Sequence, residues 1–184
     1  IGIDGNYPLS IYGTICGALL NSMTFLVEME IVPFNYYYLI IPLLTITFFI
    51  KLYKKDDDRP FENLGYTFLG ILYVAVPFAL VNELVISKDS YRPYLMMGVF
   101  IILWVNDSGA YFSGRFLGKR KLFERISPKK TWEGFIGGAL FSIIAALVYA
   151  KFQTQLELWK WVAVAIIVVI TGTLGDLVES LFKR

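Results

Sequence analysis

The 184-residue sequence contains no histidine and only one cysteine, Cys16. Without histidine, these residues offer no imidazole general base, no Ser–His triad and no His-ligated zinc site. One cysteine excludes an intramolecular disulfide and a thiolate metal cluster. Charged residues are scarce at 17% of the chain, where a soluble domain has about a quarter. Any chemistry here therefore relies on carboxylates, amines, hydroxyls and backbone groups.

Long apolar stretches take the place of the missing charge. Hydrophobic residues make up 57% of the chain, and the mean hydropathy is +0.60. A helix needs about 20 mainly apolar residues to cross a bilayer, and six stretches qualify: residues 9–27, 36–53, 64–86, 94–105, 134–150 and 159–177. The fourth reaches full length only by continuing through residues 107–110, which would draw Asp107 toward the membrane interior. The sequence predicts an all-α, polytopic integral membrane bundle of about six transmembrane helices.

Basic residues are distributed unevenly between the connecting segments. Those that follow the second, fourth and sixth spans are Lys51, Lys54, Lys55, Arg59, Arg115, Lys119, Arg120, Lys121, Arg125, Lys129, Lys130, Lys183 and Arg184. The opposite side holds only Lys88, Arg92, Lys151 and Lys160. The positive-inside rule places the richer side in the cytoplasm. We therefore expect a protein of the bacterial inner (plasma) membrane with its active site on the cytoplasmic side.

Two regions follow from this pattern. Residues 1–93 form N-terminal transmembrane helices with about three spans, and residues 94–184 form a transmembrane region of catalytic type. The second region contains a polar segment, residues 106–133, which is predicted to be a cytoplasmic basic loop. The first residue is Ile, and no basic segment precedes the first apolar run, so no signal peptide is expected. We expect the chain to be a fragment that lacks its start.

The run SPKKTWEG, residues 127–134, predicts the start of the fifth helix. Ser127 is a favoured N-cap and Pro128 suits the first helical position. The helix N-terminus then offers unpaired N–H groups and the positive end of the helix dipole. Lys129 and Lys130 would oppose that dipole unless an anion such as a triphosphate neutralised them. A polybasic anchor for anionic lipid headgroups is the alternative, but it does not require the glycines Gly109, Gly114 and Gly118.

Two aspartates lie near the ends of predicted spans. A carboxylate such as Asp107 costs roughly 2.5–3.5 kcal/mol in the membrane interior, where it is usually functional. Asp176 would share one helix face with Glu179, Ser180 and Lys183. That face is either an amphipathic helix end with a Glu179–Lys183 salt bridge or a site where Asp176 binds Mg²⁺, which takes one or two carboxylates together with substrate phosphates. We favour the second because Asp107, the two lysines and Asp176 are predicted at one membrane face.

These residues also carry a family resemblance. Asp107-x-Gly109-Ala110-Tyr111 is followed by Gly114-Arg115 and Gly118-Lys119, then SPKKTWEG, then Gly175-Asp176-Leu177-x-Glu179-Ser180. This order closely resembles the phosphatidate cytidylyltransferases, also called CDP-diacylglycerol synthases. Residues 180–184 look like the opening of that family's signature, Ser-x-hydrophobic-Lys-Arg. The resemblance covers about the second half of the chain, and SPKKTWEG is its most specific part.

The resemblance implies that CTP condenses with phosphatidate to give CDP-diacylglycerol and pyrophosphate, with Mg²⁺ as the metal. It implies Asp176 as metal ligand, and Asp107, Lys130 and Asp176 as the catalytic residues. The implied substrate-binding residues are Arg115, Lys119, Ser127, Lys129, Lys130, Thr131, Glu133, Ser180, Lys183 and Arg184. Such a transfer depends on positioning and charge neutralisation, so it needs no histidine. The expected partners are CTP, phosphatidate and membrane lipid; a homodimer is possible, and no nucleic acid is expected.

Two other functions remain open. A CTP-dependent lipid kinase would attack the γ-phosphorus and release CDP, whereas a cytidylyltransferase releases pyrophosphate. A transporter for an anionic substrate predicts charged residues midway through spans and paired broken helices. Pro42 and Pro77 interrupt the second and third spans, but charges are missing from the span interiors. The clustering of polar chemistry at one face favours an enzyme.

The family signature would continue past Arg184 with a Lys-Asp pair, a His-Gly-Gly and further aspartates that complete the metal site. We therefore expect the isolated 184 residues to be inactive. Incubation with CTP, Mg²⁺ and phosphatidate micelles should release pyrophosphate only at the background rate. Detectable CTP-dependent turnover by this segment would contradict that expectation.

Overall fold

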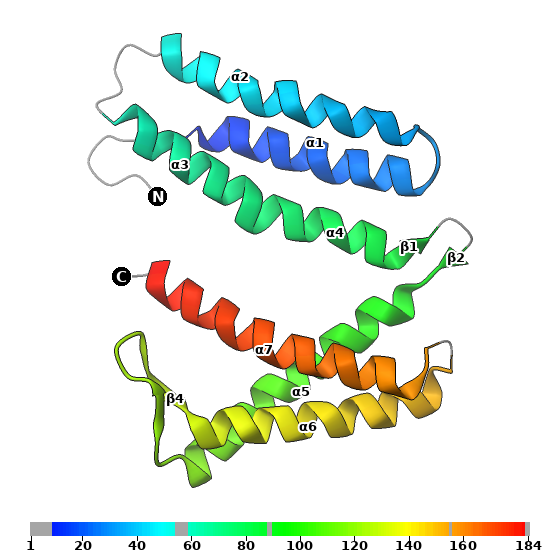
Figure 1. Ribbon diagram of the computed structural model, residues 1–184, viewed down its shortest axis with the longest axis vertical. Coiled ribbons are helices and arrows are strands. Elements are labelled where there is room, and N and C mark those ends of the chain that lie inside the picture. The colour runs from blue at the N-terminus through cyan, green and yellow to red at the C-terminus, as the bar shows by residue number, and fades with distance from the viewer. Residues whose placement is uncertain (1–8, 54–58, 88–89, 155, 183–184) are drawn as a thin grey trace. The chain divides into compact units, whose positions relative to one another are not determined.

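The computed structural model describes residues 9–53, 59–87, 90–154 and 156–182 (Figure 1). Within them, six helical segments are long and apolar enough to cross a membrane, and two short antiparallel hairpins connect helices. The chain is therefore an all-α, polytopic integral membrane protein, as the hydropathy pattern predicts. Its contacts divide it into two compact units, Ile1–Pro93 and Tyr94–Arg184, and each is described by itself.

The first unit contains three membrane spans. Its elements are α1 (Ser10–Glu28), η1 (Phe34–Leu39), α2 (Ile40–Tyr53), α3 (Pro60–Gly70), η2 (Ile71–Ala75), α4 (Val76–Val85), β1 (Ile86–Ser87) and β2 (Ser90–Tyr91). The third span runs continuously through α3, η2 and α4, even though it contains Pro77. Proline cannot donate to the carbonyl four residues earlier and its ring crowds that carbonyl. The π-helical turn η2 ends just before Pro77 and covers the affected turn, as such insertions do elsewhere.

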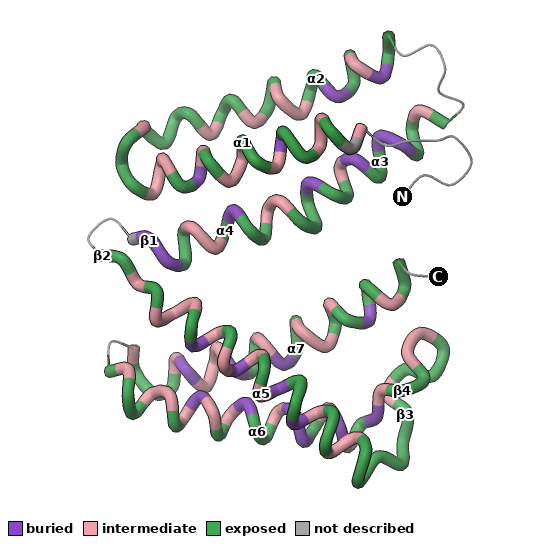
Figure 2. Tube along the Cα trace, turned by 180° about the vertical axis from the view of Figure 1, so that it is seen from behind, coloured by how far each residue is buried: buried purple, intermediate pink, exposed green. Residues whose placement is uncertain are grey.

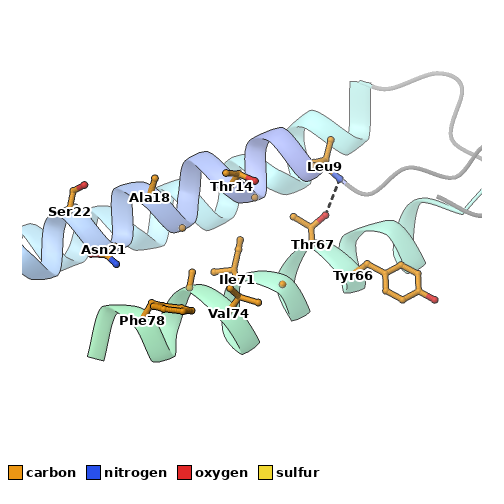
Figure 3. A pocket seen from close by; sticks show the side chains of 14 residues that line it. Leu9, Thr14, Ala18, Asn21, Ser22, Tyr66, Thr67, Ile71, Val74 and Phe78 are labelled. Carbon is orange, nitrogen blue, oxygen red and sulfur yellow. Dashed lines mark hydrogen bonds between the residues drawn. The ribbon is translucent and has the colours of Figure 1, made fainter. Parts of the chain in front are cut away.

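Polar side chains join α1 to the third span. The Asn82 amide nitrogen donates to the Asn21 carbonyl oxygen (3.1 Å), the Asn21 side-chain oxygen (3.0 Å) and the Thr24 hydroxyl (2.8 Å). Thr67 accepts a hydrogen bond of 3.1 Å from the Leu9 backbone N–H (Figure 3). Buried polar groups are costly unless they are paired, so these contacts set which faces of the helices meet.

A pocket of about 740 Å³ lies between α1 and the third span (Figure 3). Small residues form much of its wall, among them Gly13, Gly17, Gly70 and Ala75. Phe78 and Tyr66 lie toward its two ends. None of the residues predicted to form the site lines this pocket, so the candidate chemistry belongs to the second unit.

The second unit consists of α5 (Pro93–Leu117), β3 (Lys121–Phe123), β4 (Ser127–Thr131), α6 (Trp132–Phe152) and α7 (Leu158–Phe182). Its core joins all three helices through Ile102, Ala146, Trp161 and Ala165. The Tyr149 ring packs edge-on against Trp161 with 4.8 Å between the ring centroids. This core holds α7 against α5 and α6.

The six predicted spans are confirmed, but the predicted loop at residues 106–133 is too long. Helix α5 continues through Asp107 to Leu117, and α6 begins at Trp132. The segment between the helices is therefore only residues 118–131, and it forms the hairpin of β3 and β4. The small residues Gly109 and Ala110 let α5 lie against α6 as the helix continues past Val105.

Glycines bring α5 and α6 into close contact. A Cβ at Gly109 would lie 2.8 Å from the Phe141 ring, and one at Gly134 would lie 2.9 Å from the Ala110 carbonyl oxygen. Small residues allow such approach between membrane helices. In the sequence, these glycines favour a phosphate site over a bare lipid anchor, which stays a prediction. In the structure Gly109 and Gly114 have a packing role, because both lie in α5 and face α6.

Gly138→Ala tests this contact. The added Cβ would lie 2.9 Å from the Asn106 backbone oxygen and 2.8 Å from its side-chain oxygen. Overpacking of this kind costs about 1–3 kcal/mol, so thermal unfolding in detergent should show a clearly lower Tm. Gly65→Ala is the control, because a Cβ there meets nothing within 4 Å and alanine favours helix. An unchanged Tm for Gly138→Ala would contradict the close approach.

Candidate functional site

An ion pair connects the hairpin to α7. Lys130 Nζ lies 2.9 Å from Asp176 Oδ2 and donates to the Thr173 carbonyl oxygen at 3.5 Å. The Lys130 side chain is 26% exposed and that of Asp176 is 60% exposed. Two of the three predicted catalytic residues, separated by 46 positions in the sequence, are thus in direct contact.

The predicted start of the fifth helix at Ser127 and Pro128 is wrong. Residues Ser127–Thr131 form β4, which pairs with β3 through Lys121↔Thr131 and Phe123↔Ser127. The N-cap of α6 is Thr131, whose hydroxyl accepts a hydrogen bond of 3.2 Å from the Gly134 N–H. Lys129 and Lys130 therefore precede the helix. Threonine is also a favoured N-cap, and this register keeps two ammonium groups out of the first turn, where they would oppose the dipole.

Glu133 ties the hairpin to α6. Its Oε2 accepts hydrogen bonds from the backbone N–H groups of Lys119 (3.0 Å) and Arg120 (3.2 Å). The Trp132 N–H donates to the Arg120 carbonyl oxygen at 3.0 Å. A carboxylate in the first helical turn also complements the helix dipole. Glu133 therefore shapes the hairpin, while its predicted contact with substrate stays a prediction.

The hairpin presents positive charge. Figure 2 shows exposed residues along β3 and burial at the end of β4, where the chain enters α6. Its exposed basic residues are Lys119, Arg120, Lys121, Arg125 and Lys129. Such a cluster beside a membrane helix attracts polyanions, because each ammonium or guanidinium adds to one local positive potential.

Asp107 belongs to α5 and takes no part in this ion pair. It is exposed on α5, and its Oδ1 accepts from the Asn106 side-chain amide at 3.4 Å. In the part of the chain that the structure describes, no hydrogen bond or ion pair joins it to Lys130 or Asp176. Asn106 itself is buried and accepts from the Ser142 hydroxyl at 3.4 Å. Sequence reasoning missed Asn106, although its amide interrupts an apolar run directly before Asp107.

The other predicted site residues are distributed as follows. Arg115 is exposed and donates to the Tyr111 hydroxyl at 2.9 Å. Lys119 and Lys129 are exposed, Ser127 and Ser180 are half-buried, and Thr131 is buried. Lys183 and Arg184 lie outside the described residues, and so does the predicted Glu179–Lys183 salt bridge. The described part of the site therefore consists of the Lys130–Asp176 ion pair, the hairpin, and the clamp that the Glu133 carboxylate forms on the backbone of the hairpin.

Asp176 offers one carboxylate to a metal ion. Among the described residues, no group of three or more His, Cys, Asp or Glu could hold a metal. Mg²⁺ typically takes one or two carboxylates and completes its shell with substrate phosphates and water. The donor set fits an ion brought in with a phosphate ligand, and it does not form a cage made entirely of protein groups.

Comparison with known proteins identifies the family of the chain. The chain matches the cytidylyltransferase family over residues 5–184. It is 39% identical over 145 residues to the phosphatidate cytidylyltransferases of Staphylococcus saprophyticus and Staphylococcus epidermidis, covering 77% of this chain and 54% of each relative. The Haemophilus influenzae phosphatidate cytidylyltransferase is 36% identical over 152 residues, covering 77% of this chain and 51% of the relative. The chain thus spans about half the length of these curated relatives. No solved structure matches it.

Glu133→Ala tests the clamp on the hairpin. Removal of the carboxylate leaves the N–H groups of Lys119 and Arg120 without their acceptor, so we expect their hydrogen exchange to become several-fold faster. Hydrogen–deuterium exchange resolved to the 118–131 segment measures this. Glu124→Ala, in the exposed turn of the same hairpin, is the matched control and should leave those amides unchanged. Equal exchange in the parent protein and in Glu133→Ala would show that the carboxylate does not hold the hairpin.

Proposed function

The chain belongs to the cytidylyltransferase family, and from this premise we propose that the protein is a phosphatidate cytidylyltransferase. It transfers CMP from CTP to phosphatidate, forming CDP-diacylglycerol and pyrophosphate. The observation that carries the proposal is the direct contact between Lys130 and Asp176, found within a chain that resembles phosphatidate cytidylyltransferases. This contact places the Lys130 ammonium, which would bind phosphate, beside the Asp176 carboxylate, which would bind metal.

The reaction requires charge neutralisation above all. An oxygen of the phosphatidate phosphate attacks the α-phosphorus of CTP, and the bond from that phosphorus to the bridging oxygen breaks as pyrophosphate leaves. Both reactants are anionic, so they repel each other until cations lie beside them. Lys130 and Lys129 bind the nucleotide phosphates, and the rest of the hairpin raises the local positive potential. Positioning and electrostatics supply most of the catalysis in such transfers.

Asp176 would hold a Mg²⁺ ion through its single carboxylate. When bound, that ion would neutralise phosphate charge and help to orient the triphosphate. Asp107 and Asn106 support the site from α5, next to the contact with α6. Glu133 keeps the backbone at Lys119 and Arg120 in place, so that the basic side chains start from a fixed framework.

The position of the site suits a substrate that lies in a membrane. The hairpin follows the C-terminal end of α5 and precedes α6, while Asp176 lies in the C-terminal part of α7. These positions fall at the same end of the helices in the second unit, where a lipid phosphate would lie. We assign this end to the cytoplasmic side of a bacterial inner membrane, because the basic residues concentrate there and the relatives are bacterial.

Product analysis tests the proposal. The whole gene product, incubated with CTP, Mg²⁺ and phosphatidate in micelles, should form CDP-diacylglycerol and pyrophosphate in equal amounts. Release of CDP with a phosphorylated lipid would instead indicate a kinase.

The Asp176→Asn variant should fall below about a tenth of the parent activity, because a metal ligand is lost, with expression unchanged. Glu157→Gln, next to the other end of α7, is the control and should retain most of the activity.

A further inference from the structure

The ion pair between Lys130 and Asp176 places each group on a partner that the proposed function does not give it. In the proposed function, the Lys130 ammonium binds nucleotide phosphates and the Asp176 carboxylate binds a divalent cation. The structure instead joins the two to each other at 2.9 Å. We propose that Lys130 and Asp176 exchange partners when the nucleotide binds, so that the site accepts metal and nucleotide together and takes up metal alone only weakly. This inference rests on the proposed function.

Charge explains why the two residues pair without a ligand. Asp176 is partly exposed near the C-terminal end of α7, a helix with high mean hydropathy, and a cation beside it offsets the cost of a carboxylate at the edge of an apolar span. Lys130 is three-quarters buried, so its ammonium has lost part of its hydration and gains from a counter-ion. Each group therefore neutralises the charge of the other when no substrate is bound.

The same pairing discourages a lone divalent cation. To reach Asp176 Oδ2, that cation would have to displace the Lys130 ammonium, which would then lie unpaired beside a second positive charge. A triphosphate removes this difficulty, because its oxygens accept the released ammonium while the carboxylate turns to the metal. The exchange replaces one ion pair with two favourable contacts.

The fold explains why Lys130, and not its neighbour, takes this role. Side chains alternate across a strand, and in β4 Lys129 is exposed while Lys130 is half-buried. The Lys130 ammonium also donates to the Thr173 carbonyl oxygen, three residues before Asp176 on the same helix. Thr131, the next residue, caps α6. The reach of Lys130 toward α7 is therefore set by backbone that is held on both sides.

Manganese binding without nucleotide tests the exchange. The probe is Mn²⁺ alone, added to the whole gene product in detergent at about 0.15 M salt, and the electron paramagnetic resonance signal of free Mn²⁺ reports the unbound ion. Lys130→Met removes the competing ammonium, so we expect binding about two- to fivefold tighter than in the parent protein, in line with partly exposed ion pairs. Lys130→Gln should give the same gain and serves if the first variant does not fold.

Two matched variants separate this effect from a general change of charge. Lys129→Met removes the same charge from the adjacent position but leaves the ion pair, so its effect should stay below about twofold in screening salt. Lys130→Arg keeps a cation beside Asp176 and should bind Mn²⁺ as the parent does. Adding Asp176→Asn to Lys130→Met should abolish the gain, because the carboxylate that binds the ion is lost.

The outcomes distinguish this inference from the proposed function. Unchanged Mn²⁺ affinity in folded Lys130→Met, or an equal gain in Lys129→Met, overturns the exchange even if the protein makes CDP-diacylglycerol. Gain of affinity that survives Asp176→Asn also overturns it, since the ion then binds elsewhere. Failure of the parent protein to transfer CMP overturns the proposed function, and it is read from the product assay alone. Thermal unfolding of each variant shows whether it is folded.

Discussion

The close approach of α5 and α6 is the contact on which the second unit depends. At Gly134 and Gly138 the helices lie so near that a single added carbon would meet backbone oxygens of the other helix. Because the helices meet there, the chain between them has only residues 118–131 in which to reverse direction. It does so as a hairpin, and Glu133 fastens its first residues to the start of α6. The position of Lys130 at the end of β4 follows from that geometry.

The position of the basic residues on the hairpin follows from the cost of placing charge in the membrane. Cations are costly inside hydrocarbon, yet the segment between α5 and α6 is rich in lysine and arginine. The fold keeps most of them exposed on the hairpin and brings only Lys130 to the helices, where Asp176 meets its charge. The proposed transfer between phosphates depends on positioning and neutralisation, and for it the described residues offer amines and carboxylates. The acid on α5, Asp107, is supported separately through the buried amide of Asn106.

The prediction of the helix start failed because two neighbouring residues offer the same local signal. Ser127 and Thr131 are both favoured N-caps, and Pro128 makes the first appear stronger. The helix start was decided by contacts that no local pattern contains: the pairing of Lys121 with Thr131, and the hydrogen bond from the Lys119 N–H, just before β3, to the Glu133 carboxylate. The packing role of the glycines escaped the sequence for a related reason. Only the position of α6 shows that Gly109 and Gly114 are points of contact between helices.

The order of residues along the chain was enough to predict the membrane class, all six spans and the family resemblance, because long apolar runs and contiguous motifs are local properties. It also marked Lys130 and Asp176 as residues of interest. Their contact could not be derived from spacing, since 46 positions separate them and no periodic pattern reaches across a hairpin and two helices. Whether a lysine points at lipid, water or a carboxylate depends on strand register and on how closely helices pack. Strand register and helix packing arise only when distant segments meet. Here they bring Lys130 of the basic segment into contact with Asp176 of α7.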